Sequence, residues 1–526
     1  MKRSNRVQPS AEASFQSHRF LTALLPILFS VGLPACRSAM ADFYDNLAGS
    51  GTGGEAGSGG LPSTCDGDPT QLPTIVRDEC GVFVNAQAAT SGEGTKASPV
   101  KTLAEAAKLG KGRIFVCADE YTESETVSLS GGVEVYGGFE NCKPDGGWTW
   151  NTSKKAIVQG AANQPVITLT MGQNKLQGLA LFAADATLPN TSSITVVVSD
   201  GAADFIQVDL TAGAGFNGEN GVAPGDPTLA GASAPADASN ACVMGTVKGG
   251  TGAATVCDGV DTSGGKGGDG GKVSSVAGSN GLDGLPMLDP NPDGTGKGGV
   301  GESIAVCKAG TDGQPGTLGS PGAGGSDKGT LTATGIVGGD GQDGTPGTPG
   351  QGGGGGGGSK AGVFCVDAAM PELGAGASGG GGGAGGCGGK GGTGGRAGGS
   401  SIGIVSIEGS LTFSGVTITT KSGGNGGNGA LGKGGGAGGD GAKGGMASEF
   451  GVSSAGCKGG NGGAGAAGGQ GGGGRGGHSI GVAYKGGNVT TDGLAVSLGA
   501  PGMGGAGNAN ANGNGMMGTA SETVAY

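Results

Sequence analysis

Side chains able to catalyse acid–base or nucleophilic reactions are scarce in this sequence. It holds only two histidines, His18 near the N-terminus and His478 at the end of a glycine-rich tract. A Ser-His-Asp or Cys-His arrangement would therefore depend on His478, because His18 lies in the leader segment described below. A histidine beside a glycine tract is more typical of a solvated turn, so we expect no catalytic residue and no enzyme activity.

Acidic residues form the second feature that could carry chemistry. Asp119, Glu120, Glu123 and Glu125 stand close together. Such a cluster could bind calcium, but no basic partner stands at a recognisable spacing, and a glycosidase carboxylate pair is defined by its separation in space. The cluster is expected to be a solvated turn that holds no metal and no cofactor.

Calcium could also bind to Gly-Gly-x-Gly-x-Asp motifs, which begin at Gly264, Gly338 and Gly435. A β-roll repeat needs a large apolar residue two places after the Asp, where this chain has Gly271, Thr345 and Ala442. The three copies are not in tandem either. We interpret them as products of the glycine background.

Cysteines indicate an oxidising compartment. The chain has 11 cysteines and no Cys-x-x-Cys spacing, which argues against zinc. Setting Cys36 aside leaves an even number, as expected for disulfides in an exported protein. Short separations suggest three pairs, although the sequence leaves other connectivities open: Cys65 with Cys80, Cys117 with Cys142, and Cys242 with Cys257.

The first 41 residues have the pattern of an export signal. Basic residues precede an apolar run over 20–33, which is too short to span a bilayer as a helix. Two processing sites remain open: a lipobox-like Leu-Pro-Ala-Cys would lipidate Cys36, whereas Ala-Met-Ala would allow cleavage after Ala41. We expect an exported protein, either an outer-membrane or cell-envelope lipoprotein or a secreted one. A Gly/Ser linker follows over 42–64.

Composition separates the rest of the chain into two parts. Glycine contributes 133 of 526 residues, most of them after residue 200, while aromatics are only 4%. The net charge of −12 repels phosphate backbones and anionic lipid. Nucleic acid is therefore excluded as a partner, and we expect membrane contact only through a lipid on Cys36.

Residues 65–200 carry the conventional globular signal. Thr102 and Glu105 have the capping-box spacing at the start of a short helix that Gly110 ends. Short β-branched runs follow at intervals of about ten residues, as in an all-β stack of strands. Expected strands cover 81–84, 113–117, 126–129, 133–136, 157–158, 166–169, 176–182 and 194–198.

The order of motifs in this part resembles the opening of right-handed parallel β-helix proteins. The motifs are Gly81 to Val84, Gly94 to Ala107, Ile114 to Val116, and Tyr136 to Phe139 followed by two tryptophans. The remainder resembles glycine-rich, PGRS-type surface proteins and lipoproteins. This resemblance implies an all-β right-handed parallel β-helix with long glycine-rich excursions, and it implies no activity.

Residues 201–526 form a glycine-rich repeat region. Several tracts place glycine at every third position, for example over 310–325, 338–356 and 423–444. Such a register suits three-residue-per-turn helices of the polyglycine-II type, packed through backbone hydrogen bonds; disorder is the alternative. Two strand-like units, 401–420 and 479–498, repeat with an offset of 78 residues.

Function follows from the outward rows of such strands. Thr417, Thr419, Thr490 and Thr491 would form polar ladders able to contact an extended polysaccharide. We expect a non-enzymatic structural or adhesive surface protein; a carbohydrate-active lyase or hydrolase is the alternative.

Overall fold

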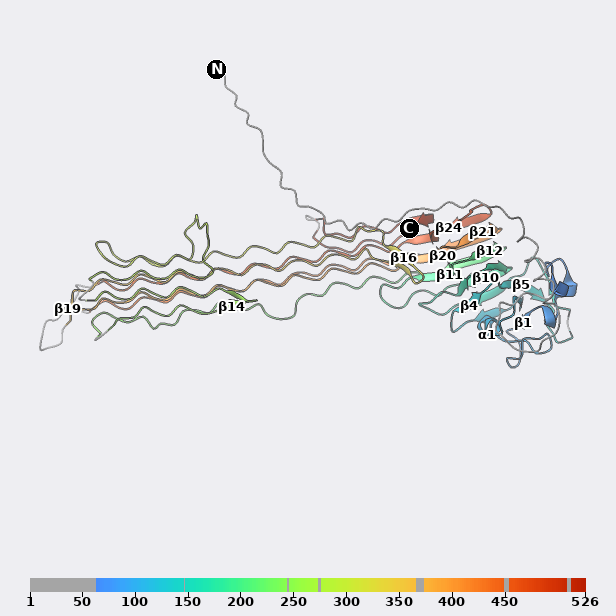
Figure 1. Cartoon of the computed structure of the whole chain (residues 1–526), viewed down its shortest axis with the longest axis horizontal. Helices are drawn as coiled ribbons and strands as arrows, with labels where there is room; N and C mark the ends of the chain where they lie inside the picture. The colour runs from blue at the N-terminus through green and yellow to red at the C-terminus, as the bar shows by residue number, and fades with distance from the viewer. Residues whose placement is uncertain are drawn as a thin grey trace, which may run out of the picture. The chain divides into compact units, whose positions relative to one another are not determined.

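The computed structural model describes residues 63–145, 147–243, 246–272, 276–365, 373–448, 454–508 and 512–526. All of them belong to one compact unit that starts at Ser58. Figure 1 shows two kinds of structure in this unit, a set of short strands and a group of long runs with few strands lying side by side. The expected signal segment with Cys36 and Ala41 lies outside the described residues.

Three parallel sheets contain most of the strands. Sheet A orders β1 (Val82–Val84), β2 (Arg113–Cys117), β5 (Glu134–Glu140), β9 (Gln173–Gln177), β12 (Ala202–Ile206) and β21 (Ser410–Ser414). Sheet B orders β3 (Glu120–Thr122), β7 (Ala156–Gln159), β10 (Leu179–Phe182), β13 (Asp209–Ala212), β22 (Val416–Thr420) and β24 (Leu494–Ser497). Sheet C orders β4 (Val127–Ser130), β8 (Ile167–Thr170), β11 (Ser193–Ser199), β20 (Ser401–Ile407), β23 (Ser479–Lys485) and β25 (Ala520–Ala525).

Smaller elements complete the structure. β6 (Thr149–Trp150) pairs antiparallel with β5. Three two-stranded hairpins are β14 (Val256–Cys257) with β15 (Val260–Asp261), β16 (Thr330–Thr332) with β17 (Gly335–Val337), and β18 (Val363–Phe364) with β19 (Leu373–Gly374). The helices are α1 (Leu103–Lys108) and the 3-10 turns η1 (Ser63–Cys65), η2 (Pro73–Ile75) and η3 (Asp78–Cys80). Thr102 caps α1 in the expected capping box with Glu105.

Inward side chains of the sheets form a conventional apolar core. Because side chains alternate between the two faces of a strand, equivalent positions of paired strands stack into rows. One row in sheet B runs through Val158, Leu181, Leu210 and Ile418, all of them buried. β-Branched and leucine side chains thus supply the core, as the sequence pattern of residues 65–200 indicates.

The expected fold, a single all-β right-handed parallel β-helix, does not describe this structure and was wrong. The strands lie in three parallel sheets placed side by side, α1 packs near their first strands, and the longest stretches of chain belong to none of the three sheets. Strands on both sides of residue 200 belong to the same three sheets, because β12, β13 and β20 to β25 extend the sheets that β1 to β11 begin. Strand propensity located the strands, because it depends on local sequence. It did not indicate how the glycine-rich segments are arranged between those strands.

Three glycine-rich excursions leave the sheets at one corner. They cover residues 213–400, 421–478 and 498–519. Each leaves after a strand of sheet B and returns to a strand of sheet C, and the shorter connection from β10 to β11 joins the same two sheets. The glycine-rich part therefore consists of three long connections of one type, from sheet B to sheet C, and the pairing of the strands continues across all three.

Runs within the excursions are held together by backbone hydrogen bonds. The N–H groups of Gly424 and Gly427 donate to the carbonyls of Gly399 and Arg396, each over 2.8 Å, and the pattern repeats every third residue. Glycine occupies the repeating position because another residue would not fit there. A Cβ on Gly438, for example, would lie 1.9 Å from the carbonyl oxygen of Gly462. Of the two possibilities that the sequence left open, the structure therefore shows ordered glycine tracts, in which three-residue-per-turn runs pack together.

Unbroken glycine runs mark the interior of this lattice. Residues 352–358 are all glycine and all buried. A Cβ added to Gly353 would lie 2.3 Å from the carbonyl oxygen of Gly460. One added to Gly354 would lie 2.0 Å from that of Lys297, and one added to Gly355 would lie 2.0 Å from that of Lys266. Successive residues face different neighbouring runs, so every position must lack a side chain. The number of adjacent glycines thus reports how many sides of a run are covered.

Candidate functional site

Two residues of the acidic cluster, Glu123 and Glu125, hold α1 in place. Glu123 is only 1% exposed, and its carboxylate accepts the backbone N–H groups of Leu103 and Ala104 at the start of α1, over 2.7 and 3.2 Å. Burial raises the pKa of Glu123, although these two hydrogen bonds oppose the shift. Glu125 pairs with Lys108. The expectation of a solvated turn was wrong for Glu123, because its role depends on a helix that only the fold brings near.

Five disulfide bonds join all ten cysteines that follow Cys36. Cys65–Cys80 and Cys117–Cys142 are the two short pairs that the spacing suggested. The pairing of Cys242 with Cys257 was wrong: the structure has Cys242–Cys365, Cys257–Cys387 and Cys307–Cys457, each between different runs of the first two excursions. Sequence proximity failed here because neighbouring runs are far apart in the chain. Five disulfides indicate an exported protein in an oxidising compartment.

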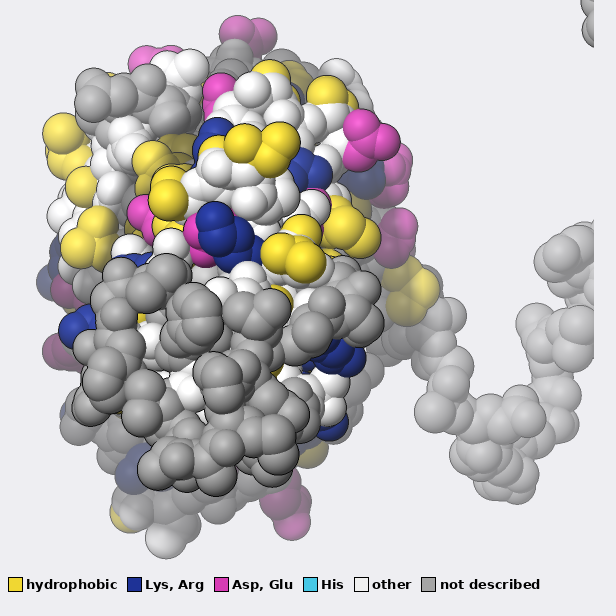
Figure 2. All heavy atoms as spheres, turned by 90° about the vertical axis from the view of Figure 1, so that its left-hand side faces the viewer, with side chains coloured by type: hydrophobic (Ala, Val, Ile, Leu, Met, Phe, Trp, Pro, Cys, Tyr) yellow, Lys and Arg dark blue, Asp and Glu magenta, His cyan; other side chains and the backbone are white. Residues whose placement is uncertain are grey.

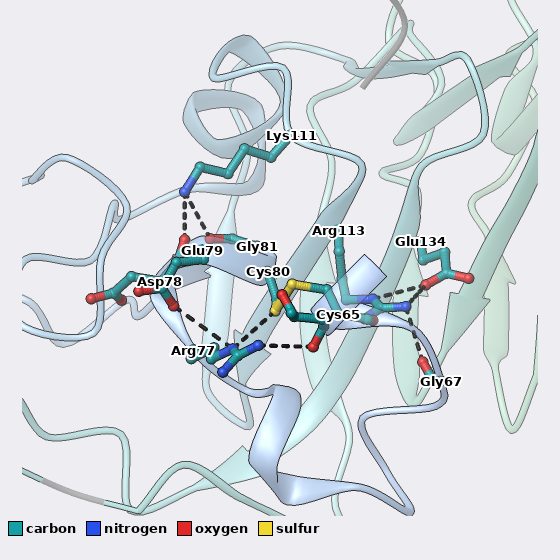
Figure 3. Close-up of a disulfide and its surroundings, with 11 residues drawn as sticks. Cys65, Gly67, Arg77, Asp78, Glu79, Cys80, Gly81, Lys111, Arg113 and Glu134 are labelled. Atoms are coloured by element: carbon teal, nitrogen blue, oxygen red, sulfur yellow. Dashed lines mark hydrogen bonds and ion pairs between the residues drawn. A yellow bond between two sulfur atoms is a disulfide. The ribbon is translucent and has the colours of Figure 1, made fainter. Parts of the chain in front are cut away.

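The first disulfide is part of a rigid attachment of the N-terminal segment. Arg113 projects from β2 and donates to the carbonyls of Cys65 and Gly67 over 2.9 and 3.1 Å, while it pairs with Glu134 of β5 at 2.6 Å (Figure 3). Its side chain is buried, so each of these contacts compensates for lost hydration of the guanidinium. Together they fix the segment to β2 and β5 of sheet A, which is a structural role.

His478 is buried rather than solvated, which corrects the expectation from the sequence. It is 4% exposed, and its Nδ1 accepts the backbone N–H of Thr519 over 3.0 Å. Burial and the nearby charge of Arg475 lower the pKa of His478 to about 4. The imidazole is neutral at physiological pH and acts as a backbone acceptor between two runs that return to sheet C.

Aspartates of two of the three glycine-rich motifs also act as acceptors for backbone N–H groups. Asp269 Oδ1 accepts from Gly249, and Asp343 Oδ1 accepts from Gly394, both over 2.7 Å. Asparagines do the same on neighbouring runs, where Asn217 accepts from Asn425 and Asn425 accepts from Met503. Within the described ranges, no group of three or more His, Cys, Asp and Glu side chains is arranged to hold a metal ion.

A cavity of about 650 Å³ lies beside the second disulfide. Asn85, Asp119, Asn141 and Lys143 line it together with Cys117 and Cys142, and burial raises the pKa of Asp119. Asp119 is the one carboxylate among the lining residues. Glycoside hydrolysis uses a pair of carboxylates, so this cavity does not have the composition of such a site.

Sheet B carries two outward rows that cross all six of its strands. The first contains Thr122, Gln159, Phe182, Thr211, Thr419 and Ser497; the second contains Glu120, Ile157, Ala180, Asp209, Thr417 and Ala495. We call these twelve residues the sheet-B face. Adjacent strands are about 4.8 Å apart, so each row is a regular ladder.

Charge and polarity on the sheet-B face are fixed by local contacts. Asp209 accepts a hydrogen bond from the Thr417 hydroxyl over 2.6 Å and pairs with Lys155 at 2.7 Å. Phe182 is 38% exposed in the middle of the first row, between Gln159 and Thr211. An aromatic side chain flanked by hydroxyl and amide groups can bind a ligand that has both an apolar face and hydroxyls.

The sequence identified part of this face. Thr417 and Thr419 lie in the two adjacent rows, as the ladder hypothesis requires. Thr490 and Thr491 precede β24 and belong to neither row. Phe182 was not singled out, because its neighbours in the row come from strands that only the pairing register identifies. The signal that could have identified Phe182 was the alternation of inward and outward side chains along its strand.

Two further findings bear on the place of this chain. Among the described residues, no helix has both the length and the apolar character needed to cross a membrane. No known protein family, curated protein or solved structure matches the chain.

Proposed function

We propose that this chain is a non-enzymatic structural and adhesive protein of the cell surface that contacts extracellular polysaccharide through the sheet-B face. The observation that carries the proposal is the regular polar ladder around the exposed Phe182. A sugar ring has an apolar face that can pack on an aromatic ring and hydroxyls that can bind Thr, Gln and Asp side chains. Repeated rungs suit a repeating polymer.

The glycine lattice supports a structural role. Its runs are joined by backbone hydrogen bonds, to which Asp and Asn side chains such as Asp269 and Asn425 add further bonds between runs. Glu123 and His478 each accept a backbone hydrogen bond that holds the fold together, which favours binding over catalysis. Resemblance to glycine-rich surface proteins points in the same direction. We further propose attachment through a lipid on Cys36, with cleavage after Ala41 as the alternative that mass spectrometry of the mature N-terminus decides.

Binding to a panel of insoluble and soluble polysaccharides tests the proposal. Wild-type protein should bind at least one of them, and Phe182→Ser should weaken that binding at least tenfold. Phe216→Ser is the matched control, since Phe216 is also 38% exposed but lies in the first excursion. Equal losses from both variants, or no binding by the wild type, would contradict the proposal. Release of new sugar ends would instead establish the enzymatic alternative.

A further inference from the structure

The turn over residues 303–306 connects two runs of the first excursion and is held firmly on both sides. Before it, Glu302 is buried, and its carboxylate accepts hydrogen bonds from the Ser454 hydroxyl over 3.1 Å and the Lys360 backbone N–H over 3.3 Å. The Lys360 ammonium lies 3.7 Å from the same carboxylate. After the turn, Cys307 is bonded to Cys457. The turn is thus preorganised.

This anchored turn exposes apolar side chains. Ile304 is 102% exposed and Val306 is 71% exposed, which means that nothing in the described structure covers Ile304. Val300 and Val276 are also exposed nearby: Val300 accepts a hydrogen bond from Lys308, and Val276 accepts one from Ala361, next to Lys360. Seen from the end of the excursion marked by β19, separate hydrophobic side chains protrude beside Lys and Arg side chains (Figure 2).

Local charge here differs from that of the whole chain. Lys308 lies two positions after Val306, and the half-exposed Lys360 ammonium pairs with the buried Glu302, so these three side chains carry a net positive charge, whereas the complete sequence carries a net charge of −12. Exposed apolar side chains flanked by lysines are the composition that binds the interface of an anionic bilayer, where lysines reach the headgroups. An anchored turn also loses little conformational entropy on insertion.

The size of the turn favours a lipid surface over a protein partner. A stable protein interface buries roughly 800 Å² on each side, far more than a four-residue turn can supply. A projecting apolar turn inserts into a bilayer without needing a complementary groove. We propose that Ile304 and Val306 insert into the headgroup region of an anionic lipid bilayer while Lys308 contacts its lipid phosphates. This inference goes beyond the polysaccharide contact and is independent of lipidation at Cys36.

Vesicle flotation tests the inference with the chain that begins at Asp42, so that no lipid on Cys36 can contribute. We expect binding to phosphatidylcholine vesicles that contain phosphatidylserine. Ile304→Ser combined with Val306→Ser should lower the partition coefficient at least tenfold. Lys308→Gln should lower it several-fold, and only with the anionic vesicles. Leu318→Ser is the matched control, because Leu318 is 77% exposed on the run that follows the turn.

Three results would overturn the inference. The wild type could fail to float with either vesicle, the double variant could float like the wild type, or Leu318→Ser could lose as much binding as the double variant. Sedimentation analysis without lipid covers another occupant: a dimer that the double variant abolishes would assign the turn to contact between two copies. Thermal unfolding of each variant confirms that the comparison is made between folded proteins.

Discussion

The sheets and the glycine excursions solve the same packing problem with opposite side-chain requirements. In sheet B, Leu181 and Leu210 stack in a row and fill the space between the sheets. In the excursions, Gly438 lies so close to Gly462 that a single methyl group would overlap a backbone oxygen. Stability therefore depends on side-chain volume in one region and on its absence in the other, where backbone hydrogen bonds replace apolar burial.

Replacing Gly438 by Val should give the largest effect, because a Cβ there would lie 1.9 Å from the carbonyl oxygen of Gly462. The atoms that this Cβ would meet belong to the backbone of the neighbouring run, which cannot move aside as a flexible side chain can. We therefore expect a loss of roughly 5 kcal/mol in the free energy of unfolding. Gly434→Val is the control on the same run, since an added Cβ at Gly434 meets nothing within 4 Å. Urea denaturation measures both, and similar losses would refute the steric account.

Removing a disulfide should have the next largest effect on the free energy of unfolding, and the loss should be greater in the excursions than beside sheet A. Cys257–Cys387 closes 130 residues within the first excursion, whereas Cys65–Cys80 closes 15 residues beside sheet A. The chain-entropy model gives about 5 kcal/mol for the long loop and about 3 kcal/mol for the short one. Double Cys→Ser variants of each pair, compared by chemical denaturation, measure this difference. The opposite ranking would show that the excursion depends less on its crosslink than the loop length implies.

Acid should weaken the junction between the excursions and sheet C through His478. Its pKa falls to about 4 in the folded protein, so the unfolded chain, with a pKa near 6.5, binds the proton more strongly. The contribution of neutral His478 to the free energy of unfolding is then fully present above pH 6.5. It falls by about 3 kcal/mol as the pH drops to 4. His478→Asn keeps an oxygen near the position of Nδ1 and does not titrate there. If its stability falls with pH as the wild type's does, His478 is not the cause.

Several features of the fold could be predicted from the sequence because they are set by local chemistry. The capping box at Thr102 and the strand propensities are local, and the 78-residue offset reappears as the strand register, with Ser401 opposite Ser479. Third-position glycine reflects the steric rule of the lattice. Cys257 with Cys387, buried His478 and the row around Phe182 depend instead on which distant segments become neighbours. No local pattern contains that information.

Residue-resolved hydrogen exchange across residues 423–444 tests most directly whether backbone hydrogen bonds hold the glycine runs together. The amides of Gly436, Gly439 and Ala442 each donate over 2.8 Å to carbonyls of the neighbouring run. We expect these amides to exchange roughly a thousandfold more slowly than an unstructured chain, and more slowly than that of the exposed Ala437. Exchange of all four amides at intrinsic rates would show that the glycine tracts are not a hydrogen-bonded lattice.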